Sequence, residues 1–252
     1  MIPTRIFIAF LLLSAQSLSA FAQKTIYDKC DELFRNKNYR EAISCYSGKQ
    51  AASQLDSLSA YYGIAYSFYK IERYDSAKIN LALLINRNNI EKKYYGIIGN
   101  AYYLLGRIYS KEKEPETELL YLKEANKYID NSNLNTTIGY DLVKLKRYND
   151  ALAYMDKGVQ LDSTSDVAYN NRGLVYIKLH QLDKAEQDLK KALKLNTKNP
   201  YIYKHLGLLY MNKNDKVLAC YYFQAALDKG YREYGNESDK NEIDELQNQI
   251  CK

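Results

Sequence analysis

The sequence predicts an all-α fold, an α-solenoid of about six stacked helical hairpins with a C-terminal capping helix. One observation behind this prediction is a spacing pattern that returns about every 34 residues, which is typical of repeat proteins. A second observation is the scarcity of turn residues. The 252 residues include 3 prolines and 11 glycines, too few for the many turn clusters of a β-sandwich of this length.

The repeat is clearest in the C-terminal half of the sequence. Tyr169, Gly173 and Tyr176 return 34 residues later as Tyr203, Gly207 and Tyr210. We number each copy so that Tyr169 is position 4 and Gly173 is position 8. Small residues also recur at positions 20 and 27 of these copies, which are Ala185, Ala192, Ala219 and Ala226.

Weaker copies precede this pair at less regular intervals. Position 8 is occupied by Gly139 and Gly106 in the two preceding copies, by Ala65 another 41 residues earlier, and by Cys30 in the first copy. The wide interval holds seven extra residues around 89–95. We interpret these as a lengthening of the first helix of that copy, expected from Glu91 to Ser110.

The spacing within a copy has a mechanical reason. Large residues at positions 4, 7 and 11 form one stripe of a helix, because their spacing is i, i+3, i+7. Positions 8 and 20 are expected where the two antiparallel helices approach most closely, so bulky side chains there would force them apart. Each hairpin then keeps one apolar face that only a neighbouring hairpin can cover.

These positions resemble the tetratricopeptide repeat family, in a form typical of an exported bacterial member. The resemblance predicts a degenerate hairpin at 23–57, two hairpins with a lengthened helix at 58–131 and three well-formed repeats at 132–233. The sequence departs from the family pattern with Tyr in place of Trp at position 4. Position 7 of the fifth copy is also unusual, since it is Arg172.

Residues 234–252 lie outside the repeats and are predicted to form the capping helix, from Asp239 to Ile250. A solenoid needs a last helix with one polar face. Ile243, Leu246 and Ile250 form the apolar stripe of this segment, and its other positions are charged or carry amides.

The first 22 residues are predicted to be a signal peptide. A short start ends in Arg5, an apolar run follows, and Ala20-Phe21-Ala22 forms a cleavage signature, with cleavage expected after Ala22. A membrane-spanning helix would need about 20 continuous apolar residues, and Ser14 and Gln16 interrupt the run too early. The sequence therefore predicts a secreted or periplasmic protein with no stable membrane insertion after cleavage.

Four cysteines remain after processing, an even number for an oxidising compartment. In an antiparallel hairpin, residues whose repeat positions sum to 31 face each other, as Cys30 at position 8 and Cys45 at position 23 do. Cys220 lies in the last repeat, and Cys251 ends the helix expected to run back along it. Disulfides 30–45 and 220–251 are predicted, and the alternative is four buried free thiols.

The first helix of each hairpin is expected to line a concave groove that binds a partner. The predicted partner-binding residues are Tyr62, Tyr66, Lys70, Tyr103, Arg107, Lys111, Tyr140, Lys144, Asn170, Lys178 and Lys204. The same reading adds Tyr27, Asp31, Arg35, Tyr69, Thr136, Leu174, Tyr201 and Leu208.

Two features of this set favour an extended, acidic peptide or the carboxyl terminus of a protein as the partner. Tyrosines crowd its N-terminal half, and tyrosine offers a large contact area with few torsions to restrict. A basic residue recurs at position 13 in five consecutive copies, from Arg35 to Lys178, and would attract negative charge. The alternative is that lysine recurs at position 13 without binding any ligand.

The function predicted from these features is that of an exported scaffold or adaptor for protein–protein interaction. A second hypothesis is glycan or small-molecule binding on the tyrosine faces. The net charge of +6 comes from interleaved charges, as in residues 111–114, and does not predict nucleic-acid binding.

An enzyme is not expected. The sequence shows no nucleophile with a nearby base and no glycine-rich phosphate loop, and its two histidines are too few for a histidine-based metal site. No cofactor is predicted. Glu114 and Glu118, one helical turn apart, form the clearest acidic pair, but we interpret them as marking a solvated or distorted helix.

Overall fold

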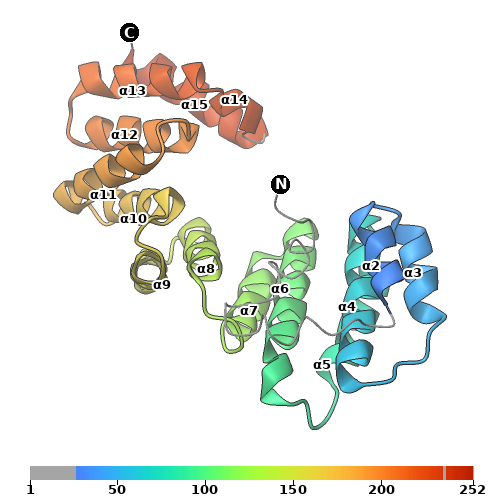
Figure 1. The fold of residues 1–252 in the computed structure, drawn as a ribbon. Coiled ribbons are helices and arrows are strands. Elements are labelled where there is room, and N and C mark those ends of the chain that lie inside the picture. The colour runs from blue at the N-terminus through green and yellow to red at the C-terminus, as the bar shows by residue number, and fades with distance from the viewer. Residues whose placement is uncertain (1–26, 235–236, 252) are drawn as a thin grey trace. The chain divides into compact units, whose positions relative to one another are not determined.

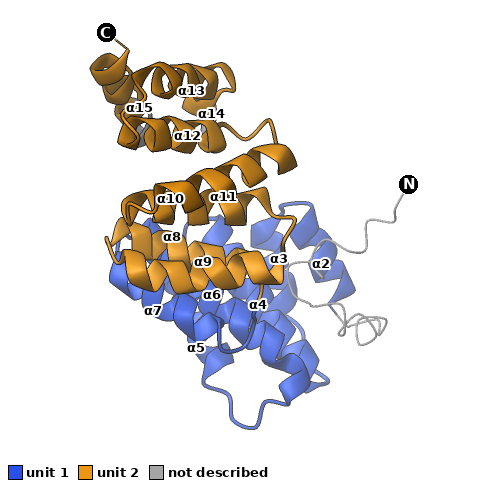
Figure 2. Ribbon diagram, turned by 90° about the vertical axis from the view of Figure 1, so that its left-hand side faces the viewer, with its two compact units in different colours: residues 1–130 blue, residues 131–252 orange. Residues whose placement is uncertain are grey.

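The computed structural model describes residues 27–234 and 237–251 (Figure 1). The protein divides into two compact units, residues 1–130 and residues 131–252 (Figure 2). The described residues form helices joined by turns, without a strand. The predicted all-α fold of stacked helical hairpins is confirmed. The predicted signal peptide lies outside the described residues.

Unit 1 holds three consecutive hairpins, in which each helix packs against the next one in sequence. Its helices are α2 (Asp28–Arg35), α3 (Tyr39–Ser47), α4 (Gln54–Lys70), α5 (Tyr74–Ile85), the 3₁₀ turn η2 (Lys92–Tyr94), α6 (Tyr95–Lys111) and α7 (Pro115–Ala125).

Unit 2 holds three further hairpins and the C-terminal helices. Its helices are α8 (Ser132–Lys144), α9 (Tyr148–Leu161), α10 (Asp166–Lys178), α11 (Leu182–Leu195), α12 (Pro200–Asn212), α13 (Lys216–Asp228), α14 (Tyr231–Tyr234) and α15 (Glu237–Ile250). The first helices α8, α10 and α12 contact one another in order along the unit.

Polar caps set where several first helices begin. The side chains of Ser53, Asn131, Ser165 and Asn199 each accept a hydrogen bond from a backbone N–H in the first turn of α4, α8, α10 and α12. Such caps satisfy donors that have no partner within the helix. The cap residues therefore fix the start of four of the six first helices.

The turn between the two helices of a hairpin has one recurring backbone conformation. One residue in each of the six turns is left-handed, with φ between 55° and 62°, and these residues are Lys37, Glu72, Lys113, Lys146, His180 and Asn214. Glycine normally favours this region. In the fifth hairpin the turn closes with a hydrogen bond from the Gln181 N–H to the Tyr176 carbonyl oxygen, at 2.9 Å.

Glycine at position 8 lies at the helix crossings, as predicted. A Cβ atom on Gly173 would lie 2.8 Å from Cγ of Leu189, and one on Gly207 would lie 2.5 Å from the ring of Phe223. Both distances are too short for real carbon atoms. The large residue on the second helix therefore occupies the space that the missing side chain leaves.

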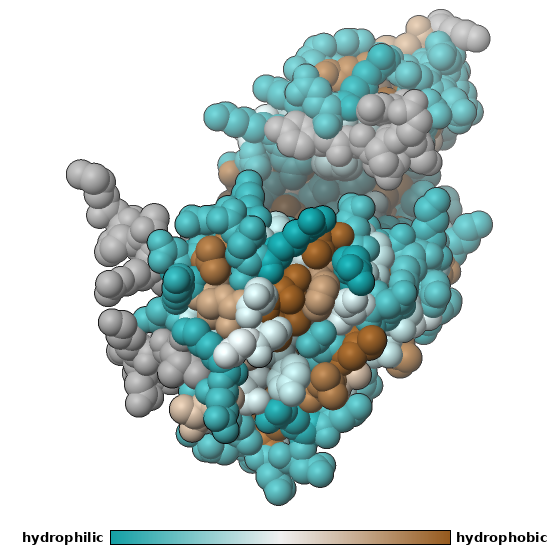
Figure 3. All heavy atoms as spheres, turned by 90° about the vertical axis from the view of Figure 1, so that its right-hand side faces the viewer, coloured by the Kyte–Doolittle hydropathy of each residue, from teal (hydrophilic) through white to brown (hydrophobic). Residues whose placement is uncertain are grey.

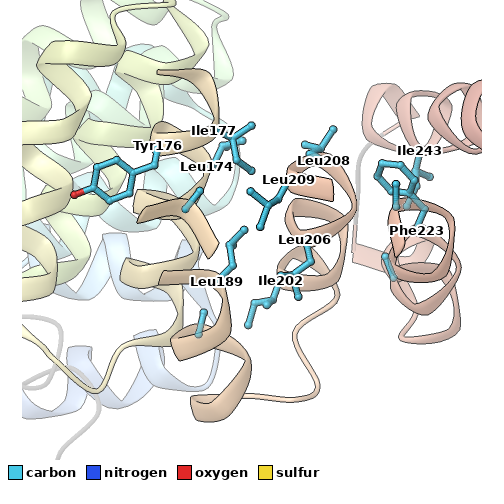
Figure 4. Packing of buried hydrophobic residues seen from close by; sticks show 14 of the residues in the cluster. Leu174, Tyr176, Ile177, Leu189, Ile202, Leu206, Leu208, Leu209, Phe223 and Ile243 are labelled. Atoms are coloured by element: carbon cyan, nitrogen blue, oxygen red, sulfur yellow. The ribbon is translucent and has the colours of Figure 1, made fainter. Parts of the chain in front are cut away.

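One hydrophobic core runs through unit 2 from α10 to α15. Figure 4 shows Leu189, Leu206 and Phe223 in successive layers of this core, and Ile243 of α15 pointing towards Phe223. Ile243 is fully buried, and Leu246 and Ile250 pack against the same core. The apolar stripe predicted for the capping helix is confirmed.

Two helix boundaries differ from the prediction. The first helix of the third hairpin begins at Tyr95, not at Glu91, because residues Lys92–Tyr94 form a 3₁₀ turn after the left-handed Asn89. This helix is nevertheless lengthened, with 17 residues against 13 in α8, α10 and α12. The capping helix begins at Glu237, two residues before the predicted start.

Arg172 at position 7 departs from the family pattern because it makes an ion-pair network. Its guanidinium donates to both carboxylate oxygens of Asp188 on α11, at 2.7 and 2.9 Å, and to Asp156 on α9, at 2.9 Å. Asp188 is buried. A buried ion pair is stable only when its attraction and its hydrogen bonds offset the cost of desolvation. Here the hydrogen bonds of Arg172 join three helices.

Glu118 is not on a solvated or distorted helix. It is buried in the regular helix α7, at the position where the other copies carry a small residue. Its backbone carbonyl lies 3.3 Å from the place where a Cβ on Gly106 would be. Glu114 is exposed and accepts a hydrogen bond from Thr117, so the two carboxyl groups lie in different environments.

The four cysteines pair as 30–45 and 220–251 in the structure. The Cα atoms of each pair lie 5.4 Å apart, within the range usual for a disulfide. One bond joins α2 to α3, and the other joins α13 to the end of α15. The first bond therefore links the two helices of the first hairpin, and the second ties the C-terminal helix to the last hairpin.

Some hydrophobic residues remain on the surface of unit 1. Figure 3 shows hydrophobic residues gathered in the middle of one face, with hydrophilic residues around them. On α5 and α7 the exposed hydrophobic residues are Ile79, Leu83 and Leu120. Of the described residues, none belongs to a helix that is both long and apolar enough to cross a membrane.

Candidate partner-binding groove

A groove of about 580 Å³ runs along unit 2. The first helices α8, α10 and α12 supply most of its walls, and α15 supplies one residue. Its lining residues are Tyr140, Val143, Lys144, Val167, Asn170, Asn171, Leu174, Lys178, Asn199, Tyr201, Lys204, His205, Leu208 and Glu242. Apolar side chains, two tyrosines, amides and lysines are therefore presented together.

The buried pair Asn170 and His205 lies in the wall of this groove. The Nδ1 atom of His205 lies 2.9 Å from Oδ1 of Asn170. Because an amide oxygen only accepts, Nδ1 is the donor of this hydrogen bond. Burial and the nearby charges of Lys204 and Lys178 lower the pKa of His205 to about 3. The imidazole is therefore neutral at physiological pH.

The lysines of the groove differ in how their charge is compensated. Lys204 is buried and donates to Oε2 of Glu242 at 2.6 Å. Lys144 is exposed and donates to Asp141 at 2.7 Å. Lys178 is exposed, and no carboxylate partner for it is present among the residues that the structure describes. Positive charge thus remains available near the middle of the groove.

The first helices of unit 1 present an aromatic face. The rings of Tyr62 and Tyr69 lie 6.0 and 5.9 Å from the ring of Tyr66, which also meets Phe34 edge-on at 5.3 Å. Burial raises the pKa of Tyr62, and the neighbouring Tyr66 and Tyr103 add to this rise. These tyrosines therefore form one cluster rather than separate surface residues.

Two cations border this aromatic face. The ammonium group of Lys70 lies 5.4 Å from the centre of the Tyr66 ring, within the range of a cation–π contact. Arg107 on α6 donates to the hydroxyl of Tyr103 at 3.5 Å. Lys111, the last residue of α6, is exposed.

The structure brings together most of the residues predicted for unit 2. Tyr140, Lys144, Asn170, Lys178 and Lys204 all line the groove, together with Leu174, Tyr201 and Leu208. Thr136 does not. Its hydroxyl donates to the Ser132 carbonyl oxygen, and its methyl group lies against Gly158 of α9, so the prediction that it lines the groove is wrong.

Six lining residues were missed by the sequence reasoning, namely Val143, Val167, Asn171, Asn199, His205 and Glu242. His205 is at position 6, which lies beside the predicted position 5 on the helix, and including position 6 would have found it. Glu242 could not be found from the repeat, because α15 lies outside it. No cluster of three or more His, Cys, Asp or Glu side chains suited to a metal ion occurs in the described residues.

Comparison with known proteins identifies the repeat. Residues 99–131 and 167–199 each match the tetratricopeptide repeat family. A TPR repeat-containing protein of Methanocaldococcus jannaschii is 31% identical over 161 residues, which cover 63% of this chain and 27% of that protein. Anaphase-promoting complex subunit 3 of Schizosaccharomyces pombe is 28% identical over 156 residues, 62% of this chain and 22% of that protein. The chain thus spans about a quarter of the length of these relatives.

Solved structures support the fold at low sequence identity. MamA of Desulfovibrio magneticus superimposes with a TM-score of 0.60 at 19% identity, over 73% of this chain and 100% of that chain. YrrB, described as a TPR protein with an unusual peptide-binding site, has a TM-score of 0.54 at 18% identity, over 68% of this chain and 85% of that chain. With the hairpins, the helix crossings and the two family matches in agreement, this chain contains tetratricopeptide repeats.

Proposed function

We propose that this protein is an exported, non-enzymatic interaction scaffold that holds an extended, acidic segment of a partner protein in the groove of unit 2. The observation that carries the proposal is the groove itself. Its lysines lie beside two tyrosines and a row of amides on three successive helices. YrrB, which shares the fold, is described as having a peptide-binding site.

The chemistry of the lining suits a peptide in extended conformation. Asn171 carries an amide that can both donate to and accept from a peptide backbone, while the amides of Asn170 and Asn199 pair with His205 and Asp166. Tyr140 and Tyr201 offer flat apolar contact with a polar tip. Lys178 supplies a charge that favours an acidic partner and speeds encounter.

The test is binding of labelled peptides to the processed protein, followed by fluorescence anisotropy. The probes are a fluorescein-labelled decapeptide that alternates Glu with Ala and the same peptide with Gln in place of Glu. We expect the Glu peptide to bind more tightly, and Lys178→Gln to weaken its binding about threefold to tenfold. Lys216→Gln, an exposed lysine at the start of α13 that does not line the groove, is the matched control.

Equal binding of both peptides, or equal effects of the two lysine variants, would reject the acidic-peptide groove. The aromatic face of unit 1 is tested separately with Tyr62→Ala/Tyr66→Ala/Tyr103→Ala. Unchanged capture of a partner by this triple variant would show that the aromatic face of unit 1 takes no part in binding. Binding of a soluble polysaccharide in place of both peptides would favour the glycan hypothesis.

Export is tested by expressing the whole protein and a form that lacks residues 1–22 in a bacterial host. We expect the whole protein outside the cytoplasm with Gln23 as its first residue, as determined by N-terminal sequencing. The shortened form should remain in the cytoplasm. Retention of both forms in the cytoplasm would contradict the proposed localisation.

A further inference from the structure

Lys204 is a buried cation whose partner comes from outside the repeats. Its side chain is 8% exposed, and its Nζ atom lies 2.6 Å from Oε2 of Glu242. The same ammonium group lies 5.2 Å from the centre of the Tyr231 ring. A buried charge is stable only when an opposite charge or strong hydrogen bonds accompany it. A carboxylate or another strong hydrogen-bond acceptor must therefore accompany Lys204 while unit 2 is folded.

The two partners differ greatly in their exposure to solvent. The side chain of Glu242 is 49% exposed, while that of Lys204 is almost fully covered. Both residues line the groove. A ligand lying in the groove can therefore reach the carboxylate side of the pair directly, and the lysine stays in place as the fixed half of the site.

Helix α15 does not depend on this ion pair to stay docked. Ile243 is fully buried in the core, and Gln247 donates to Gln224 of α13 at 2.8 Å. Arg232 pairs with Asp244, and the 220–251 disulfide joins the end of α15 to α13. Glu242 can therefore turn away by rotation of its own side chain, without release of the helix.

We propose that the Lys204 end of the groove is a carboxylate-binding subsite which Glu242 fills from within the protein, and that a carboxylate of the bound partner replaces Glu242 on Lys204. This inference rests on the proposed function, because it assigns the partner chemistry at one end of the same groove. Glu242 is then an internal competitor, which weakens the binding of acidic ligands and excludes neutral ones from Lys204.

The experiment compares Glu242→Gln with the wild type in the anisotropy assay. The variant keeps the size of the side chain and removes its charge. We expect it to bind the Glu–Ala decapeptide about threefold to tenfold more tightly than the wild type does, with no gain for the Gln–Ala decapeptide whose C-terminus is amidated. Glu245→Gln is the matched control, since it makes the same change on the exposed part of α15 and does not line the groove.

A second pair of probes separates the two sources of a carboxylate. The Gln–Ala decapeptide is used with a free C-terminus and with an amidated one. A gain in the Glu242→Gln variant for the free form alone assigns the subsite to the terminus of a partner protein. A gain for the Glu–Ala peptide in amidated form assigns it to acidic side chains. Circular dichroism and thermal unfolding check that α15 remains folded in both glutamine variants.

The failures are distinguishable. If the wild type binds the Glu–Ala peptide and Glu242→Gln binds it no better than Glu245→Gln, the inference that Glu242 competes with the ligand is wrong. The proposed function then still stands. An equal gain for charged peptides and for neutral, amidated ones would also overturn the carboxylate subsite. If none of the proteins binds any peptide, the proposed function fails and this inference fails with it.

Discussion

His205 donates a hydrogen bond from Nδ1 to Oδ1 of Asn170 across 2.9 Å, joining α12 to α10 in the wall of the groove. The residues are 35 positions apart, about one repeat. Lys204 and Glu242 make the next link of the same kind, from α12 to α15. Polar contacts thus join α12 to α10 on one side and to α15 on the other in the wall of the groove.

The buried His205 predicts that stability depends on pH. The unfolded protein binds a proton at this residue below a pKa of about 6.5, whereas the folded protein does so only near its own pKa of about 3. The free energy of unfolding should therefore fall as the pH drops from about 6.5 towards 3. The contribution of His205 to this slope is at most about 1.4 kcal/mol per pH unit.

Urea unfolding of the wild type and of His205→Gln at several pH values between 7 and 4 measures this slope. The other titrating groups are present in both proteins and cancel in the comparison. The wild type should lose stability more steeply than the variant. Parallel curves for the two proteins would show that His205 takes up its proton in the folded state.

The Arg172 network predicts strong energetic coupling. Arg172→Met should destabilise the protein by about 3 kcal/mol, because it leaves the buried carboxylate of Asp188 without its partner. Asp188→Leu should cost a similar amount, and the double variant should lose clearly less than the sum. A double-mutant cycle by chemical denaturation gives the coupling energy.

Asp156→Asn is the matched control for this network. The Asp156 side chain is 52% exposed, so its contact with Arg172 should contribute less than about 1 kcal/mol. Additive losses in the Arg172 and Asp188 variants would contradict the network as a source of stability.

A side chain added at Gly207 is expected to clash where α12 crosses α13. Gly207→Ala would place a Cβ atom 2.5 Å from the Phe223 ring, which is fully buried. We expect a loss of about 2 kcal/mol in the free energy of unfolding, since the strain exceeds the gain in helix propensity. Adding Phe223→Leu should recover part of the loss, because Leu189 fills the equivalent place at Gly173. A neutral or stabilising Gly207→Ala would mean that the helices can separate without cost.

The disulfides predict an increase in stability at both ends of the described residues. Mass spectrometry after alkylation should show no added alkyl groups without prior reduction and four after it. Cys30→Ser/Cys45→Ser and Cys220→Ser/Cys251→Ser should each lower the free energy of unfolding by about 2–4 kcal/mol. Four alkyl groups on the unreduced protein would show that the thiols are free.

The repeat could be predicted because its determinants are local. Gly173 and Gly207 mark helix crossings through their spacing from the large residues of the same hairpin, and both lie at those crossings. The start of α6 at Tyr95 could not be predicted. The extra residues form a 3₁₀ turn after the left-handed Asn89 before the α-helix begins, and the spacing of the repeat does not specify such a turn. Thr136 shows the same limit. Its side chain packs against Gly158 on the second helix of the same hairpin and does not face the groove.

The sequence by itself determined the hairpins, their order and more than half of the residues that line the groove of unit 2. Hydrophobic periodicity and close helix approach act over a few turns and leave a regular trace in the sequence. Only the tertiary structure decided which polar residues meet. Arg172 pairs with Asp188 and Lys204 pairs with Glu242, while His205 is buried beside Asn170. These contacts join residues on different helices. Their energies depend on burial and distance, which the spacing of residues within a repeat does not specify.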